Sequence, residues 1–308
     1  MTTIQFSEAI TNYKERPDLL DMITGSPFDY NGISGLAIVD NELFVTVYES
    51  AYLYVYDLKD FHSTKTRTKL RDAKNPYDLG YCSKSKCLYV MDTWLTKILK
   101  VDLSGCQKIM WATKGYGCIS ITHDCNVLMA DSKGNKIIEY TPDGKIHLEI
   151  VSKEFVHPKH ALKLADGRYL ISQGRWRDVL PKLCVVDKSG NIQMSYGPRF
   201  FTPTYLAIDS AGSIFAVDCR QFRVLLFSSD FKFIREIISS KRNYSLVSND
   251  WEMDDWEMDY FEMEDWTMHS WGLKCPPRMV FDEANGLLIL SINGQRLGDE
   301  GALVFRIA

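Results

Sequence analysis

Four residues with charged or reactive side chains occupy equivalent places along the chain. They stand at the start of a short apolar segment that recurs through the sequence, and they are Asp78, His160, Tyr205 and Arg278. A metal-dependent enzyme brings two or three histidines or carboxylates to one ion. This set supplies one histidine and one carboxylate, so we expect no metal site there and a hydrogen-bonded role for His160.

Aspartates end the second apolar segment of three repeats, at Asp92, Asp131 and Asp218. A ring of such carboxylates would suit a metal ion. An aspartate at the end of a strand also accepts hydrogen bonds from amides of the following turn. Because the repeat itself generates these positions, we favour turn capping.

The eight cysteines lack the paired spacing of a zinc site. The first residues carry no signal-peptide pattern, so we expect reduced, buried thiols and a cytoplasmic protein. If one disulfide forms, Cys82 and Cys87 are the candidates, because they flank a four-residue turn and would face each other across a hairpin. No apolar run approaches the roughly 18 residues that span a bilayer, so we expect no membrane partner.

Basic and aromatic side chains share several polar stretches between the apolar segments. Such loops can bind a protein or stack on single-stranded RNA. They contain Trp94, Arg175, Trp176, Arg177, Arg220 and Phe222. The densest basic run, residues 65–74, instead has the alternation of an outer strand, where cations discourage edge-to-edge pairing. The net charge of -4 argues mildly against a nucleic-acid partner.

Residues 251–271 repeat a five-residue unit with eight carboxylates and no lysine or arginine. Its aromatic positions are Trp251, Trp256, Phe261, Trp266 and Trp271. A step of five matches neither the helix nor the strand period. Three interpretations stay open: an arm that docks beside Arg175 and Arg177, a solvated duplication, and an acidic calcium loop.

Six repeats provide the elements that position these residues. Each has an apolar strand, a polar turn and two or three further strands, and the equivalent positions are Ala37, Gly80, Ser120, Leu162, Ala207 and Val280. The steps between them are 43, 40, 42, 45 and 73 residues. Four strands in roughly 40 to 45 residues is the length of a propeller blade. The sequence therefore predicts an all-β, six-bladed β-propeller forming one domain over residues 1–308. The long step places an acidic insert, residues 240–275, between blades 5 and 6.

The ends of the chain predict how the ring closes. The sixth repeat stops after its third strand, and we expect Thr2 to Phe6 to pair beside Leu303 to Ile307 as the fourth. The stretch near residue 20 is expected to form at most a turn or two of helix. The inner-strand starts Asp78, His160, Tyr205 and Arg278 would then ring the channel mouth. The aromatic and basic loops would share one face with the insert.

The repeats NPYDLGYCSKSKCLYVMDTWLTKILKVDLSG and TPTYLAIDSAGSIFAVDCRQFRVLLFSSDFKFIREI resemble the NHL-repeat family of six-bladed propellers. The resemblance covers about residues 30–308, without the cysteine and histidine clusters that precede the propeller in tripartite-motif proteins. It implies a stand-alone propeller that binds protein or RNA. Related lactonase-like hydrolases hold calcium at inner-strand ends. The matching positions here are Ser34, Asp78, Gly117, Lys159, Thr204 and Pro277, a poor calcium cage.

The function we expect is therefore a non-enzymatic protein-interaction scaffold that binds through the face carrying the insert, with no cofactor. The alternatives are a hydrolase with calcium in the channel and a module for single-stranded RNA. The sequence leaves the oligomeric state open.

Overall fold

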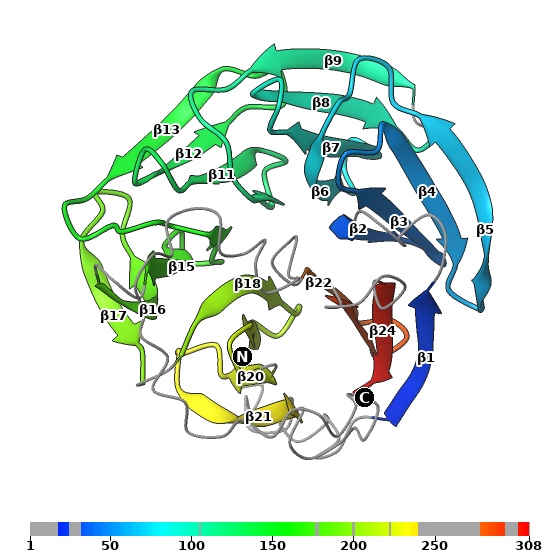
Figure 1. Ribbon diagram of the computed structural model, residues 1–308. Coiled ribbons are helices and arrows are strands. Elements are labelled where there is room, and N and C mark those ends of the chain that lie inside the picture. Colours follow the sequence, from blue (N-terminus) through cyan, green and yellow to red (C-terminus); the bar gives the residue numbers. More distant parts are fainter. Residues whose placement is uncertain are drawn as a thin grey trace, which may run out of the picture.

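The computed structural model describes residues 18–24, 32–104, 106–175, 179–198, 201–221, 223–239, 278–292 and 301–307. These residues form six four-stranded antiparallel sheets arranged around a central axis, which is a six-bladed β-propeller (Figure 1). The acidic insert, residues 240–275, lies outside the described residues. The described strands on either side of it, which end at Ser239 and begin at Met279, belong to successive blades of the ring.

The blades follow one another along the chain, each from its inner to its outer strand. Blade 1 contains β2 (Ile33–Val39), β3 (Glu42–Val47), β4 (Tyr52–Asp57) and β5 (Asp60–Lys69). Blade 2 contains β6 (Pro76–Cys82), β7 (Cys87–Asp92), β8 (Lys97–Asp102) and β9 (Gln107–Ala112). Blade 3 contains β10 (Ile119–Ile121), β11 (Val127–Asp131), β12 (Lys136–Tyr140) and β13 (Ile146–Val151).

The second half of the ring repeats this order. Blade 4 contains β14 (His160–Lys163), β15 (Tyr169–Arg175), β16 (Val179–Val186) and β17 (Ile192–Tyr196). Blade 5 contains β18 (Pro203–Ile208), β19 (Ile214–Asp218), β20 (Arg223–Phe227) and β21 (Phe233–Ser239). Blade 6 contains β22 (Met279–Asp282), β23 (Leu287–Ile292), β24 (Gly301–Arg306) and β1 (Asp18–Thr24).

The core consists of apolar layers between neighbouring blades. The second strands of blades 2, 3 and 5 are buried along their whole length, which explains their nearly continuous apolar sequences. Near the axis the inner strands approach closely, and this requires small residues. A β-carbon at Gly80 of β6 would lie 2.8 Å from Cγ1 of Ile121 in β10. A larger residue at position 80 would therefore push blades 2 and 3 apart.

The ring is closed by an N-terminal strand, but not by the residues that we expected. β1 (Asp18–Thr24) pairs antiparallel with β24, and Met22 lies opposite Leu303 (Figure 1). The prediction for Thr2 to Phe6 is therefore wrong, and so is the helical turn near residue 20. The physical reason is the length of the connection: β1 ends at Thr24, nine residues before β2 begins at Ile33, and connections between adjacent elements are usually short.

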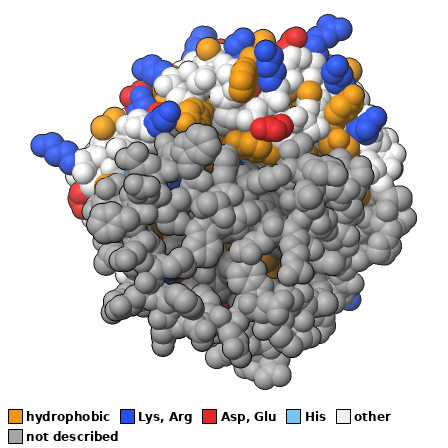
Figure 2. All heavy atoms as spheres, in the orientation of Figure 1, with side chains coloured by type: hydrophobic (Ala, Val, Ile, Leu, Met, Phe, Trp, Pro, Cys, Tyr) orange, Lys and Arg blue, Asp and Glu red, His pale blue; other side chains and the backbone are white. Residues whose placement is uncertain are grey.

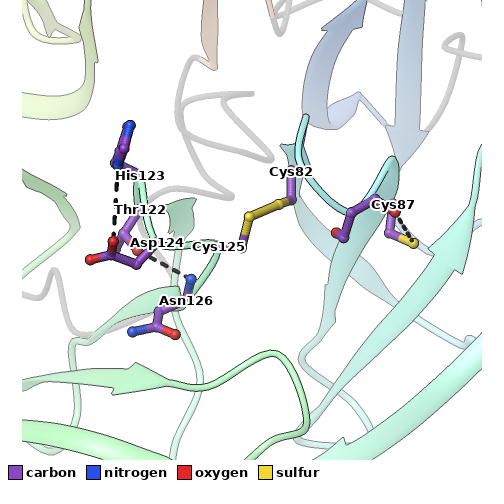
Figure 3. Close-up of a disulfide and its surroundings, with 8 residues drawn as sticks. Cys82, Cys87, Thr122, His123, Asp124, Cys125 and Asn126 are labelled. Carbon is purple, nitrogen blue, oxygen red and sulfur yellow. Dashed lines mark hydrogen bonds and ion pairs between the residues drawn. A yellow bond between two sulfur atoms is a disulfide. The ribbon is translucent and has the colours of Figure 1, made fainter.

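A disulfide joins blades 2 and 3. It links Cys82, the last residue of β6, to Cys125 in the turn before β11, with Cα atoms 5.7 Å apart (Figure 3). The expectation of eight reduced thiols is wrong for this pair, and so is the Cys82–Cys87 pairing. Cys87 lies opposite Cys82 in the hairpin, yet its thiol donates to the carbonyl of Ser85. Cys82 meets its partner across the contact between blades, which spacing within one hairpin does not reveal.

Candidate functional site

The structure brings Asp78, His160, Tyr205 and Arg278 into one group, here called the channel cluster. They come from blades 2, 4, 5 and 6, at or beside the beginning of the innermost strand of each blade. All four side chains are buried. Asp78, Tyr205 and Arg278 contact one another, and His160 stacks on Tyr205.

Arg278 is the largest fully buried side chain among the described residues, and its guanidinium contacts three other blades. Nε donates to the carbonyl of Ser34 at 2.6 Å, and Nη2 donates to the carbonyl of Tyr77 at 2.7 Å. Nη1 lies 3.1 Å from Sγ of Cys118. The guanidinium also faces the rings of Tyr77 and Tyr205, at 4.8 and 5.3 Å from their centroids. Such contacts offset the large cost of burying a charge.

Asp78 is the counter-ion of Arg278, with Oδ1 3.6 Å from Nε. Its carboxylate accepts from the amides of Leu79 and Ile119 at 3.0 and 2.8 Å, and from the Tyr205 hydroxyl at 3.1 Å. Burial raises the pKa of Asp78, while the Arg278 charge and these hydrogen bonds act in the opposite direction. Burial and the adjacent Asp78 also raise the pKa of Tyr205, so its hydroxyl remains a proton donor.

His160 links blades 3, 4 and 5. Its ring stacks on Tyr205 with centroids 3.9 Å apart, and its Nδ1 accepts from the amide of Leu206 at 3.2 Å. Nε2 lies 3.4 Å from the carbonyl of Ile119, which fits the neutral tautomer with its proton on Nε2. Burial, together with the charge of Arg278, lowers the pKa of His160 to about 3.

The channel cluster therefore directs its hydrogen bonds to itself and to the inner strands. In the part of the chain that the structure describes, no three His, Cys, Asp or Glu side chains gather as a metal ion requires. Six positions match the inner-strand ends where related hydrolases hold calcium. At one of them, Ser34, the side chain is buried and its hydroxyl donates to the Thr46 hydroxyl at 3.1 Å. The hydrogen bonds of the channel cluster join the inner strands of different blades.

Two of the three strand-end aspartates cap turns as expected. Asp92 accepts from the amide of Leu95 at 2.9 Å, and Asp131 accepts from the amide of Gly134 at 3.0 Å. Asp92 also accepts from two amides that lead into β6, at Lys74 and Asn75. Asp218 bonds differently: it accepts from the Thr202 amide and from Nε of Arg223.

The connections from the second to the third strand of each blade, and from each blade to the next, share one side of the ring, here called the loop face. Trp94 and Arg220 are exposed on it. Arg175 ends β15 on the same side. The remaining predicted binding residues lie outside the described residues: Trp176, Arg177, Phe222, Trp251, Trp256, Trp266 and Trp271. The insert connects to this face, because Ser239 at its start pairs with Arg223 beside the β19–β20 turn.

The basic run at residues 65–74 begins in β5, the outer strand of blade 1, as its alternation predicts. Lys65 pairs with Glu42, and Arg67 lies over the ring of Tyr52 at 4.6 Å. In Figure 2, Lys and Arg side chains gather along the upper edge of the described part, where β5, β9 and β13 lie in Figure 1. These contacts fit a charged outer edge.

Besides the channel cluster, the structure contains a buried polar group around Glu139 that the sequence did not predict. Glu139 of β12 is buried between blades 3 and 4 and accepts from Asn126, Lys163 and Tyr169 at 2.7, 3.0 and 2.8 Å. Burial by itself would raise the pKa of Glu139, but these three partners lower it. The signal available in the sequence was an acidic residue inside the apolar segment KIIEY. All of its partners lie in other strands or turns, so only the fold reveals the group.

The fold and the buried channel cluster define the class of this protein as a six-bladed β-propeller. No family model matches the chain, and no curated protein matches it. Solved structures with the same fold include the PQQ-bound aldose sugar dehydrogenase from Streptomyces coelicolor, at 14% identity and a TM-score of 0.63, covering 95% of this chain and 98% of that one.

Two further solved structures are similar in fold to this chain. A catalytically inactive virginiamycin B lyase from Staphylococcus aureus with quinupristin is 13% identical over 92% of this chain and 98% of that one, with a TM-score of 0.61. The WD40 β-propeller domain of Doa1 is 12% identical over 96% and 97%, with a TM-score of 0.57. At these identities the likeness shows the fold and leaves open whether the protein is an enzyme or a scaffold. No described helix could cross a membrane.

Proposed function

We propose that this chain is a non-enzymatic scaffold for protein interactions, of the kind that the NHL resemblance implies, and that it binds through the loop face. The single observation that carries the proposal is the bonding of the channel cluster. Arg278, Asp78 and their neighbours bond to one another and to the main chain. Side chains that bond in this way stabilise the ring. The residues that bind a partner protein are therefore expected in the loops.

Two features of the loop face support this assignment. Loops on a rigid scaffold can vary without disturbing the core, and binding residues concentrate there. Trp94 exposes 72% of its surface on this side, and tryptophan is one of the residue types enriched at binding hot spots. The acidic insert also connects to this face.

The test compares partner capture by variants of the two sides. The loop-face variant combines Trp94→Ala, Arg175→Glu and Arg220→Glu. The control variant changes the opposite side with Ile146→Ala and Lys188→Glu, two exposed positions at the third-to-fourth-strand turns. We expect proteins captured by the full chain to be lost from the loop-face variant and kept by the control, with both variants showing the same thermal unfolding as the full chain.

The competing functions predict different outcomes. An enzyme of the hydrolase type would hold a stoichiometric divalent ion, which elemental analysis of the purified protein detects. An RNA-binding module would retard single-stranded oligonucleotides with a steep dependence on salt. Either result, or equal capture by both variants, would contradict the scaffold proposal.

A further inference from the structure

A pocket with a volume of about 270 Å³ lies between blades 2 and 3. Its walls come from the turn after β6, with Ser83 and Lys84, and from the turn after β10, with His123. These turns join first to second strands, so they lie on the side of the ring opposite the loop face. Ser83, Lys84 and His123 are exposed, and solvent therefore reaches the pocket from that side. The volume is at the lower end for small-molecule sites, and it suits a small ligand.

The disulfide between Cys82 and Cys125 (Figure 3) forms part of the wall of this pocket. Each of the two cysteines adjoins an exposed turn residue, because Cys82 precedes Ser83 and Cys125 follows Asp124. Cys125 exposes 9% of its surface and Cys82 exposes 2%, so Cys125 is the more accessible of the two. A molecule small enough to enter the pocket therefore meets the bridge while the chain stays folded.

A third cysteine lies close to the bridge but is not directed at it. Cys87 is opposite Cys82 in the β6–β7 hairpin, and its thiol donates to the carbonyl of Ser85 at 3.1 Å. Its sulfur points away from the bridge (Figure 3). Among the described residues, the bridged cysteines are the only ones that line the pocket. A thiol that attacks the bridge through the pocket therefore comes from outside the chain.

We propose that the Cys82–Cys125 disulfide is a redox site, which a low-molecular-weight thiol reduces from the pocket. The thiolate attacks Sγ of Cys125 and forms a mixed disulfide with it. The bond to Cys82 breaks, and its electron pair stays on the Cys82 sulfur, which takes up a proton. A second thiolate attacks the sulfur of the first small thiol, which releases a small disulfide and leaves Cys125 as a thiolate that is then protonated. Two small thiols are thus oxidised by two electrons, and the bridge is reduced to two thiols.

This reaction goes beyond the scaffold function, because the pocket and the loop face are on opposite sides of the ring. Access is one of the factors that set the rate of thiol–disulfide exchange, and exposed bridges are the labile ones. Reduction removes the covalent link between blades 2 and 3, so that contact would respond to the thiol concentration around the protein. A purely structural bridge would behave differently, since thiols would reduce it only after the chain unfolds.

The experiment treats the full-length folded chain with reduced glutathione, then quenches with acid, alkylates free thiols and maps the bridged peptides by mass spectrometry. Every chain carries Cys106→Ser, which removes an exposed free thiol. We expect the bridge to be lost at a rate proportional to the glutathione concentration, through a mixed disulfide at Cys125. Ser83→Tyr places a large side chain at the pocket and should slow the loss by roughly tenfold or more, because it limits access. Ser189→Tyr, at an exposed turn serine of blade 4, is the matched control and should leave the rate unchanged.

Three results would overturn the inference: a rate that does not depend on glutathione concentration, equal rates in Ser83→Tyr and Ser189→Tyr, or a mixed disulfide at Cys82 alone. The first would mean that unfolding limits reduction. Both serine variants are also reduced in denaturant, where equal rates show that a difference in the folded chain comes from the pocket. Thermal unfolding before reduction checks that the variants are folded. Partner capture through the loop face is measured separately, so either proposal can fail while the other stands.

Discussion

At the scale of single residues, the channel cluster shows how a charge is held at the centre of a propeller. Arg278 donates to Ser34 and Tyr77 in two other blades and contacts Cys118 in a third. Removing one partner of a buried ion pair typically costs about 3 to 5 kcal/mol, because the other charge is left uncompensated. Replacing either Asp78 or Arg278 alone is therefore expected to destabilise the packing of the inner strands.

His160 makes this arrangement sensitive to acid. Its pKa is about 3 in the folded chain and 6.5 without burial, so between these values the unfolded chain binds one more proton. The free energy of unfolding therefore rises with pH. The stabilisation that comes from keeping His160 neutral in the folded chain is lost as pH falls from about 6.5 towards 3. As pH falls through this range, we expect the free energy of unfolding of the wild-type chain to decrease by about 1.4 kcal/mol per pH unit relative to that of the His160→Gln variant. Chemical unfolding of both chains between pH 7 and pH 4 measures the difference, and parallel pH profiles would contradict the assignment.

At the scale of elements, β1 decides whether the ring has an edge. β24 would expose unpaired main-chain groups without it, and such an edge can pair with another molecule. β1 brings Met22 opposite Leu303 and Thr24 opposite Gly301. A strand from one end of the chain thus completes the blade made by the other end.

Deleting residues 1–24 should therefore destabilise the chain by at least about 3 kcal/mol, taking about 1 kcal/mol for each main-chain hydrogen bond lost. It should also promote self-association through β24. A chain lacking residues 1–17 keeps β1 and serves as the control. Thermal unfolding and size-exclusion chromatography compare the two. The same loss in the shorter deletion would show that closure needs residues before β1.

At the scale of the whole molecule, the disulfide adds a covalent link between two adjacent blades of the ring. Cys82 and Cys125 are 43 residues apart in sequence and lie in the same apolar layer between blades 2 and 3. A bridge over such a loop restricts the unfolded chain and typically contributes about 2 to 4 kcal/mol. Six other cysteines accompany it in the sequence, and Cys106 is an exposed free thiol.

We expect Cys125→Ser to lower the free energy of unfolding by about 2 to 4 kcal/mol in guanidinium titrations. A reductant should lower the wild-type value to that of the variant and leave the variant itself unchanged. Cys106→Ser is the matched control and should retain the wild-type stability and its response to reductant. A wild-type chain indifferent to reductant would rule out a stabilising bridge.

Local sequence patterns are enough to predict the blade. Alternating apolar strands, polar turns and a step of 40 to 45 residues are local properties, so the six repeats and the outer position of β5 could be predicted. The same patterns place Asp78, His160, Tyr205 and Arg278 at equivalent inner-strand starts. The contacts between blades became known from the three-dimensional structure: the Cys82–Cys125 bridge, the hydrogen bonds of Glu139 and the pairing of β1 with β24. These contacts join residues far apart in sequence, and their partners depend on how the blades pack against each other, which no spacing within one repeat records.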